Sequence, residues 1–338
     1  MFRIIYLSDN DGYRRETESF LKEWMGDGDF ITAHTSGSTG KPKEILLPKK
    51  DMKVSARATN RRFGIDSHSR MLCPLSANYI AGKMMIARAV EADCEVAFCT
   101  PSNDFWDKEE TIRYLAQGDV ALLPIVPSQA VSLLKRRDNP SLQSVRNIII
   151  GGAPLTVETE EKLLASLPGH TQAFATYGMT ETCSHVALRK LGAEYFSAMP
   201  GITFSTDVRG CLEITAPEYS FGKLQTNDIA TLLGDDRFIW RGRFDNVINS
   251  GGIKVFPEEM ERMLEGLLPS RFYIKGTPDP KWGEAVTLVI VDSPAIRDIA
   301  DRELLAICDS VLTGAERPRR IVRISAIHLT PNGKIKRD

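Results

Sequence analysis

The sequence has no long apolar stretch. Its 338 residues contain nothing close to the roughly 20 consecutive apolar residues that a membrane-spanning helix needs. Residues 1–16 read MFRIIYLSDNDGYRRE, a short apolar run followed by charge, which is unlike a secretory signal. We therefore expect no membrane span, and a cytoplasmic location is the simplest interpretation.

Cysteine and histidine are both sparse. The six cysteines form no CxxC pair, which argues against a zinc ribbon and against a disulfide scaffold. We expect them to be small buried residues in a reducing compartment. The five histidines show no HExxH spacing, so the sequence does not support a metallohydrolase.

The chain also lacks an excess of charge of either sign. Lys and Arg number 43 and Asp and Glu 44, so the net charge is -1 and gives no general electrostatic case for a nucleic-acid or membrane-surface partner. With 42% hydrophobic and 26% charged residues, the composition is that of an ordinary globular protein. The length suggests about two domains.

Helices and strands alternate over the first half of the chain. Residues 146–150 (RNIII) form an apolar, β-branched run that stops at two glycines, as a buried strand does. The same periodicity predicts helices over 17–25, 52–63, 82–91 and 157–167, and strands over 95–99, 120–124 and 173–176. This alternation predicts an α/β domain with a largely parallel sheet.

The pattern changes after about residue 195. Short antiparallel strands are expected over 204–215, 229–233 and 238–240, and form a small β subdomain. A helix over 257–267, a strand over 285–291 and a helix over 302–312 follow. We predict a large domain over 1–244 and a small, mobile α+β domain over 245–338, joined by a candidate hinge.

Residues 35–43, TSGSTGKPK, form a glycine- and hydroxyl-rich segment after an expected strand. Glycines allow tight turns and close approach of a ligand, and successive N–H groups beside lysines suit a polyphosphate. The spacing is not that of the common P-loop, which argues against a generic ATPase or kinase. A polar surface loop is the alternative.

Two further segments have the residue types of a nucleotide site. Residues 176–182, TYGMTET, follow an expected strand, where an aromatic ring can stack on a base and a carboxylate can hold Mg²⁺. Residues 225–228 (QTND) and 241–246 (RGRFDN) combine an aspartate, which can accept ribose hydroxyls, with an arginine for sugar or phosphate. Taken alone, each also fits an ordinary turn. The same holds for residues 249–252 (NSGG) and for the basic tail, 331–338 (PNGKIKRD).

In this order, the five segments resemble the adenylate-forming superfamily of acyl-CoA synthetases, luciferases and peptide-synthetase adenylation domains. TSGSTGKPK resembles its phosphate loop, TYGMTET its aromatic–Gly–x–Thr–Glu motif and TNDIA its ribose motif. GRFDNVINSGGIKVFPEEME resembles its hinge and glycine loop, and PNGKIKRD its catalytic-lysine motif. The resemblance covers about nine-tenths of the chain and implies ATP, Mg²⁺ and CoA as cofactor and co-substrates.

The resemblance also implies residue roles. The phosphates would be held by Thr35, Ser36, Gly37, Ser38, Thr39, Gly40 and Lys41. The rest of the nucleotide would contact Gly152, Ala153, Tyr177, Gly178, Asp228 and Arg243. Catalysis would fall to Glu181 as the Mg²⁺ ligand, Thr180 near the α-phosphate, and Lys334 between carboxylate and phosphate oxygens. Asp245 matches the hinge, and Gly251 and Gly252 match the loop presented to the thiol.

Two finer features resemble the o-succinylbenzoate–CoA ligase family of menaquinone biosynthesis. The glutamate motif continues as Cys183-Ser184, and residues 74–88 read PLSANYIAGKMMIAR. The family resemblance assigns Gly82, Arg88 and Thr176 to the acyl substrate, with Arg88 near its free carboxylate. A helix-surface arginine is the alternative for Arg88. The phosphate loop lies unusually early here, so we expect this sequence to lack much of the N-terminal subdomain that is usual in the superfamily.

The implied reaction joins a small carboxylic acid to CoA through an acyl-adenylate, with release of AMP and diphosphate. Another aryl- or fatty-acyl-CoA ligase, or an enzyme that loads a carrier protein, would keep this chemistry with a different substrate. A degenerate nucleotide-binding protein without catalysis is a further alternative, although Glu181 and Lys334 are both present. A homodimer is among the assemblies that the sequence allows.

Overall fold

The computed structural model describes residues 1–8, 10–35, 43–135, 140–329 and 335–337. The chain divides into two compact units. The first comprises Met1–Leu155, Thr159–Thr203 and Thr215–Leu224, and the second comprises Thr156–Glu158, Phe204–Ile214 and Gln225–Asp338. Within the described ranges, no helix is both long enough and apolar enough to cross a membrane.

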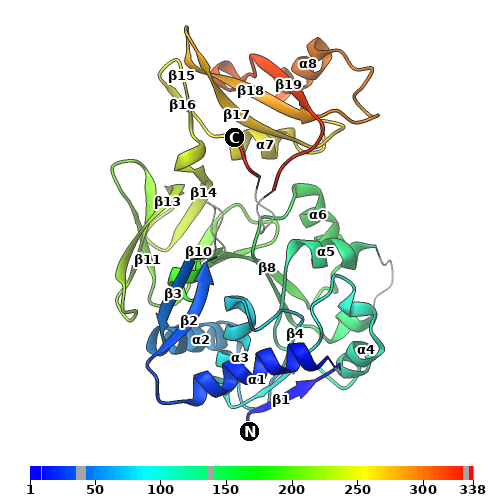
Figure 1. Ribbon diagram of the computed structural model, residues 1–338, viewed down its shortest axis with the longest axis vertical. Coiled ribbons are helices and arrows are strands. Elements are labelled where there is room, and N and C mark those ends of the chain that lie inside the picture. Colours follow the sequence, from blue (N-terminus) through cyan, green and yellow to red (C-terminus); the bar gives the residue numbers. More distant parts are fainter. Residues whose placement is uncertain (9, 36–42, 136–139, 330–334, 338) are drawn as a thin grey trace. The chain divides into compact units, whose positions relative to one another are not determined.

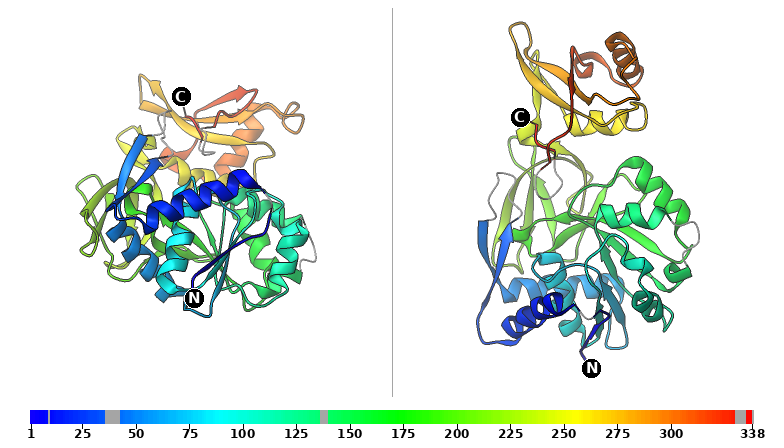
Figure 2. Two further views of the ribbon diagram at one scale, coloured as in Figure 1. Left: turned by 60° about the horizontal axis from the view of Figure 1, so that its bottom comes forward. Right: turned by 45° about the vertical axis from the view of Figure 1, so that its right-hand side comes forward.

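The first unit is built from parallel and antiparallel strands with helices around them (Figures 1 and 2). Its strands are β1 (Arg3–Tyr6), β2 (Phe30–Thr35), β3 (Lys43–Pro48), β4 (Arg70–Cys73), β5 (Glu95–Phe98), β6 (Leu123–Ile125), β7 (Asn147–Ile150), β8 (Gln172–Gly178), β9 (His185–Lys190) and β10 (Phe196–Ala198). Its helices are α1 (Asp11–Met25), α2 (Lys49–Phe63), α3 (Ile80–Ala92), α4 (Glu109–Leu115), α5 (Pro127–Leu134) and α6 (Val157–Ser166), with short η1 (Phe105–Asp107), η2 (Pro140–Ser144) and η3 (Thr180–Thr182). The predicted α/β fold class is confirmed.

Two sheets and a hairpin organise this unit. Strands β1, β5 and β4 are parallel and lie in that order. In the second sheet, β6, β7 and β8 are parallel neighbours, and β9 and β10 continue the order antiparallel. Strands β2 and β3 form an antiparallel pair, from Phe30↔Pro48 to Thr35↔Lys43. The carboxyl ends of β7 and β8 therefore lie at one edge of one sheet.

The local sequence explains several of these elements. Helix α1 starts six residues before its predicted range, because the Asn10 side chain caps it by accepting the Tyr13 N–H at 3.1 Å. Its buried residues, Tyr13, Thr17, Phe20 and Trp24, recur at helical spacing. Strand β7 is apolar, as suits a buried parallel strand: residues 148–150 are at most 5% exposed, and Ile148 and Ile150 belong to a hydrophobic core cluster of the first unit.

The second unit contains two groups of strands. The first group is β11 (Thr203–Thr206), β12 (Cys211–Ala216), β13 (Gly222–Leu232) and β14 (Arg237–Arg243), in that spatial order. The predicted strand over 204–215 is divided into β11 and β12. The carboxylate of Asp207 accepts the N–H groups of Arg209 and Cys211 there, and Gly210 has a φ of +83°.

The second group of strands has its own core. Its elements are η4 (Phe244–Asn246), β15 (Ile248–Ser250), β16 (Ile253–Val255), α7 (Pro257–Leu264), β17 (Phe272–Asp279), β18 (Gly283–Val291), α8 (Asp301–Val311), η5 (Gly314–Glu316) and β19 (Arg320–Ile324). Alternate residues of β18 at 286, 288 and 290 share one hydrophobic cluster with Met260 of α7 and Leu304 of α8. Both helices therefore pack on the same face of this sheet. Helix α7 ends before its predicted end, since Gly266 follows with a φ of +78°.

Candidate functional site

Two predicted nucleotide-binding segments meet at the carboxyl ends of β7 and β8. These strands are parallel neighbours with Ile150 opposite Ala175. The hydroxyl of Thr176 donates to the Ile150 carbonyl at 3.2 Å, and a Cβ on Gly151 would lie 2.5 Å from that hydroxyl oxygen. Glycine is required there by close packing, and Gly152 follows with a φ of +92°. The first unit thus brings residues 152–153 beside residues 176–178.

Tyr177 is the aromatic residue at this edge. Its ring packs against Phe196 of β10, with ring centroids 5.8 Å apart, and the Arg189 guanidinium lies 5.8 Å from the Phe196 centroid. The Tyr177 ring is therefore held in place, half-buried, beside the Gly151-Gly152 turn. An aromatic face held at the carboxyl edge of a parallel sheet suits a nucleobase.

The turn after β8 presents the predicted metal ligand. In η3, the Thr182 hydroxyl accepts the Met179 N–H at 3.0 Å and fixes the turn. Between them, Glu181 is exposed, and among the described residues its carboxylate has no hydrogen bond or ion pair. A hard carboxylate oxygen of this kind fits Mg²⁺, which typically takes one or two carboxylates together with substrate phosphates. No group of three or more His, Cys, Asp or Glu side chains in the described ranges could hold a metal by itself.

Gly178, the last residue of β8, packs closely against the start of β9. A Cβ on Gly178 would lie 2.3 Å from the carbonyl oxygen of Ser184 and 2.7 Å from the Cα of His185. Cys183 has a φ of +62°, a conformation that costs a non-glycine residue about 1 kcal/mol or more. The backbone over 178–185 is consequently a tight, strained loop with little freedom to shift.

Arg88 of helix α3 is buried within the first unit. Its side chain is 3% exposed, which excludes the helix-surface alternative. The Nη2 donates to the Ser184 hydroxyl at 2.7 Å, and Nη1 lies 3.4 Å from the Met85 sulfur. Among the described residues, its Nε has no hydrogen-bond partner and no carboxylate forms an ion pair with it. Burial lowers the pKa of Arg88 to about 10, so the group is still charged at neutral pH.

Gly82, predicted to line the acyl site, has a packing role in helix α3. A Cβ at this position would lie 2.2 Å from the carbonyl oxygen of Ser76. Glycine is therefore required for helix α3 to approach the segment 76–77. Its predicted contact with the substrate stays a prediction.

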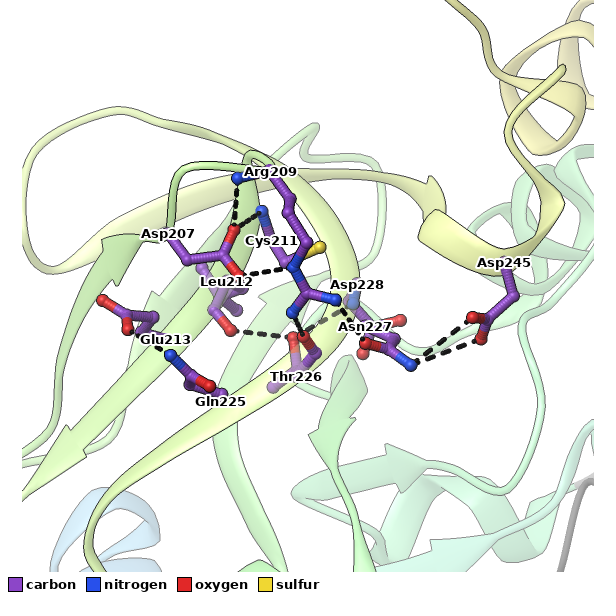
Figure 3. A network of polar contacts seen from close by, with 10 residues as sticks. All are labelled: Asp207, Arg209, Cys211, Leu212, Glu213, Gln225, Thr226, Asn227, Asp228 and Asp245. Carbon is purple, nitrogen blue, oxygen red and sulfur yellow. Dashed lines mark hydrogen bonds and ion pairs between the residues drawn. The ribbon is translucent and has the colours of Figure 1, made fainter. Parts of the chain in front are cut away.

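The ribose motif forms a polar cluster in the second unit (Figure 3). Asp228 of β13 is paired directly with Arg243 of β14, and Nη1 of Arg243 lies 3.7 Å from an Asp228 oxygen. The same Arg243 bonds Asp245 at 3.0 Å, and the Asn227 amide nitrogen lies 3.5 Å from both Asp245 oxygens. The predicted ribose and hinge residues are thus brought together.

Two residues of this cluster were missed by the sequence analysis. The indole N–H of Trp240 donates to Asp228 at 3.1 Å. Arg209 bonds Asp207 at 2.8 Å and Asn227 at 3.2 Å, and its guanidinium lies 5.1 Å from the ring of Phe244, beside the hinge position. Trp240 lies on β14 and Arg209 in the turn between β11 and β12, 12 or more residues from their partners in the motif, so no local motif marks them.

The predicted glycine loop lies between β15 and β16. Gly251 has a φ of +62° and Gly252 one of +83°. The Gly251 N–H donates to the Trp282 carbonyl at 2.7 Å, and a Cβ on Gly251 would lie 2.8 Å from the indole ring. The Arg319 guanidinium covers this indole at 3.8 Å. Trp282 and Arg319 were also not predicted.

Several predicted residues lie outside the described ranges. They are Ser36, Gly37, Ser38, Thr39, Gly40, Lys41 and Lys334. Thr35 ends β2, and residues 36–42 join it to β3. After residues 330–334, Ile335 pairs with Leu329, and Arg337 donates to the Ile274 carbonyl at 2.5 Å and to Glu261 at 2.8 Å. Arg337 thus anchors the chain close to the predicted catalytic lysine.

The parallel strand ends, the glutamate turn and the Asp228–Arg243 pair define the class of protein: an adenylate-forming enzyme. The family model described as "AMP-binding enzyme" matches residues 26–207, and the chain belongs to this family. The predicted superfamily is confirmed.

Relatives of known structure or name agree with this assignment. A crystal structure of an acyl-CoA synthetase (AMP-forming)/AMP-acid ligase II-like protein from Dyadobacter fermentans is 30% identical, with 97% of this chain and 93% of that chain covered and a TM-score of 0.64. The o-succinylbenzoate CoA synthetase (MenE) of Bacillus subtilis, solved with the acyl-adenylate OSB-AMP, shares the fold at 21% identity, with coverage of 90% and 67% and a TM-score of 0.75. A 2-succinylbenzoate–CoA ligase of Listeria monocytogenes is 27% identical over 96% of this chain and 72% of its own length.

Proposed function

We propose that this chain is an AMP-forming acid–CoA ligase and that its acid is 2-succinylbenzoate. Two findings support the proposal. The chain belongs to the AMP-binding enzyme family, and several of its relatives are named 2-succinylbenzoate–CoA ligase. The observation that favours this particular acid is the environment of Arg88, whose buried guanidinium has no carboxylate partner among the described residues.

The electrostatics of Arg88 favour an anionic substrate group. An unpaired buried ion costs several kcal/mol, whereas a paired and hydrogen-bonded ion is tolerated. The Nε–H without an acceptor is a ready donor, and a guanidinium binds a carboxylate through two parallel hydrogen bonds. 2-Succinylbenzoate has a second carboxylate that does not react, whereas benzoate, ferulate and fatty acids have none.

The proposed reaction has two steps. A carboxylate oxygen of the acid attacks the α-phosphorus of ATP, and diphosphate leaves with the bonding electron pair. The thiolate of CoA then attacks the acyl carbon of the mixed anhydride, and AMP leaves. The first step depends on positioning and on stabilisation of charge in the transition state.

The residues divide this work as follows. In the first unit, Tyr177 and the Gly151-Gly152 turn would receive adenine. Thr180 and Glu181 would face the phosphates, and Glu181 would hold the Mg²⁺ that would neutralise developing negative charge. In the second unit, Asp228 would accept the ribose hydroxyls while Trp240 holds its carboxylate in orientation. The phosphate segment 35–41 and Lys334 would complete the first step.

Diphosphate release tests the proposal directly. The purified chain is assayed with ATP, Mg²⁺ and a panel of acids that comprises 2-succinylbenzoate, benzoate, ferulate, a fatty acid and amino acids, with and without CoA. Selective release with 2-succinylbenzoate, and thioester only when CoA is added, is the expected result. Release with a monocarboxylic acid instead would keep the enzyme class and overturn the substrate. ATP binding without release for any acid would favour the degenerate nucleotide-binding protein.

Arg88→Met is the matching substitution, because Met fills a similar volume without charge. Loss of a charge-assisted contact should raise KM for 2-succinylbenzoate about 10- to 100-fold, with KM for ATP almost unchanged. The control is Arg57→Met, since Arg57 is an exposed arginine of α2 that pairs with Glu91. An unchanged KM for the acid in Arg88→Met would remove Arg88 from the acyl site.

A further inference from the structure

A run of hydrogen bonds joins Arg88 to helix α2 through the loop that carries the glutamate motif. The Nη2 of Arg88 donates to Ser184 Oγ at 2.7 Å, and this oxygen lies 3.3 Å from Nδ1 of His185. Across the ring, Nε2 of His185 lies 3.3 Å from Oγ1 of Thr59. His185 and Thr59 are 6% and 0% exposed, so bulk water does not replace these partners.

The proton positions follow from counting donors. Thr59 donates its single hydroxyl hydrogen to the Ser55 carbonyl at 3.0 Å, so it can only accept from His185. The ring therefore has its hydrogen on Nε2 and a lone pair on Nδ1. Ser184 donates to that lone pair and accepts from Arg88. Every hydrogen bond in the run then points the same way, from the guanidinium to the Ser55 carbonyl.

Only the neutral ring fits this arrangement. A second proton, on Nδ1, would face the Ser184 oxygen, whose own hydrogen would then have no other acceptor among the described residues. It would also place a second cation beside Arg88. Burial, followed by the charge of Arg88, lowers the pKa of His185 well below its usual range, in agreement with this count.

The backbone around Ser184 and His185 also has little freedom to move. A Cβ on Gly178 would collide with the Ser184 carbonyl, and Cys183 has the strained φ of +62°. The hydroxyl that receives Arg88 is thus fixed by the loop that also carries Thr180 and Glu181. The Asn60 amide adds a fixed point by donating to the Arg88 carbonyl at 2.9 Å.

We propose that His185 is a positioning residue for the acid substrate: through Ser184 it fixes the guanidinium of Arg88 so that its free donors face the second carboxylate of the acid. This role rests on the proposed function, in which Arg88 binds that carboxylate. It assigns His185 no contact with the substrate.

The chemistry of the ring allows matched variants. His185→Phe keeps the ring volume and removes both hydrogen bonds. His185→Asn places an amide oxygen where Nδ1 stands and can keep the bond from Ser184, whereas His185→Gln reaches the Nε2 position and can keep only the bond to Thr59. Thr59→Val removes the anchor of Nε2 at nearly constant volume.

KM for each substrate separates positioning from a general structural role. We expect His185→Phe and His185→Gln to raise KM for 2-succinylbenzoate about 10-fold or more, with kcat and KM for ATP within about 3-fold of wild type. His185→Asn should stay within about 3-fold of wild type in all three parameters, as rescue by the variant that keeps the Ser184 bond. A monocarboxylic acid accepted weakly by the wild type should show no change in KM in any variant.

Three results would overturn this role. One is an unchanged KM for 2-succinylbenzoate in His185→Phe. Another is a parallel rise of both KM values together with a lower melting temperature in all variants, which would indicate a structural residue. The third is a wild type that activates acids without regard to a second carboxylate. That result overturns the proposed substrate as well, so the two failures are distinguishable.

The tautomer provides a test that does not depend on turnover. In wild-type protein labelled with ¹⁵N-histidine, the His185 ring should show a protonated Nε2 and an unprotonated Nδ1 at neutral pH, and Thr59→Val should change the Nε2 signal. A protonated Nδ1 would reverse the order of the hydrogen bonds and overturn the proposal.

Discussion

Arg88 and His185 lie in contact with the same serine, and at neutral pH the first is a cation whereas the second is neutral. Arg88 keeps its proton although burial lowers its pKa to about 10, and His185 is held neutral by burial and by Arg88. At neutral pH the Arg88–Ser184–His185 group therefore bears one positive charge, that of the Arg88 guanidinium. In the free protein this charge is a cost to stability, which a bound carboxylate would remove.

That cost predicts a stability effect opposite to the effect on activity. Arg88→Met should raise the free energy of unfolding by about 1–3 kcal/mol, because a buried unpaired ion is replaced by an apolar side chain of similar volume. Urea denaturation of the free variant and wild type measures this difference. A destabilised Arg88→Met would mean that the Ser184 hydrogen bond outweighs the desolvation of the guanidinium.

The lowered pKa of His185 makes the free energy of unfolding depend on pH. Above about pH 6.5 the ring is neutral in both the folded and the unfolded chain. Below this pH the unfolded ring takes up a proton and the folded ring, with its lowered pKa, does not, so the free energy of unfolding falls as pH falls. The slope from this residue approaches about 1.4 kcal/mol per pH unit.

Urea denaturation of wild type and His185→Phe at about pH 7 and about pH 5.5 isolates this contribution. The wild type should lose more stability than the variant over the interval. Equal losses would show that the folded ring accepts a proton as readily as the unfolded one.

At the scale of elements, the loop from β8 to β9 depends on Gly178. Gly178→Ala would drive a Cβ into the Ser184 carbonyl at 2.3 Å, and backbone on both sides leaves no flexible end to move aside. We expect a loss of about 2–4 kcal/mol of stability together with impaired activity toward both ATP and the acid. Gly28→Ala is the matched control, since nothing lies within 4 Å of its Cβ position. A Gly178→Ala variant as stable as Gly28→Ala would contradict the tight packing of this loop.

The elements that the sequence predicted are those with a strong local period or a strong stop signal. Helices α2 and α3 and strands β7 and β8 have such signals, and their predicted positions agree with the structure to within a few residues. Strands β1, β4, β9 and β10 were missed, because they are short and their residues are mixed in polarity. Only their neighbours in the sheet make them strands, and that pairing is not visible in a local window.

The same contrast holds for the candidate site. Tyr177, Asp228 and Arg243 were predicted because they belong to contiguous motifs; the structure places Asp228 opposite Arg243, and their contacts with a nucleotide stay predictions. Trp240 contacts the ribose motif from β14, and Arg209, Trp282 and Arg319 contact the motifs from segments between strands, whereas His185 lies one residue past a motif. Their importance arises from folding, so a motif search does not find them.

At the scale of the whole molecule, the C-terminal residues form a body with its own hydrophobic core. The cluster that includes Ile248, Ile274 and Leu312 lies entirely after residue 245, within the second compact unit, which also takes in Phe204–Ile214 and begins its last segment at Gln225. The domain boundary at 244–245 and the mobility of the small domain remain predictions. The chain end is tied to this core by Arg337, whose guanidinium bonds Glu261 of α7.

The prediction at this scale is that Lys334 serves adenylate formation but not thioester formation. If the small domain brings Lys334 to the phosphates only for the first step, Lys334→Ala should slow adenylate formation by about 100-fold or more. Thioester formation from preformed adenylate should stay within about 3-fold of wild type, because it does not need that charge. Lys336→Ala, at an exposed lysine two residues further on, is the control. Equal losses in both half-reactions would contradict this prediction.

The six cysteines have a practical consequence. All of them are buried and unpaired, and burial raises the pKa of Cys73 to about 12 and of Cys308 to about 11. Thiolates, not thiols, react with disulfide reagents, so the folded enzyme should be silent in a colorimetric thiol titration at neutral pH. Consumption of CoA can then be read from native aliquots without background from the enzyme. Denaturant makes the same six side chains countable, so one reagent reports both turnover and loss of the fold.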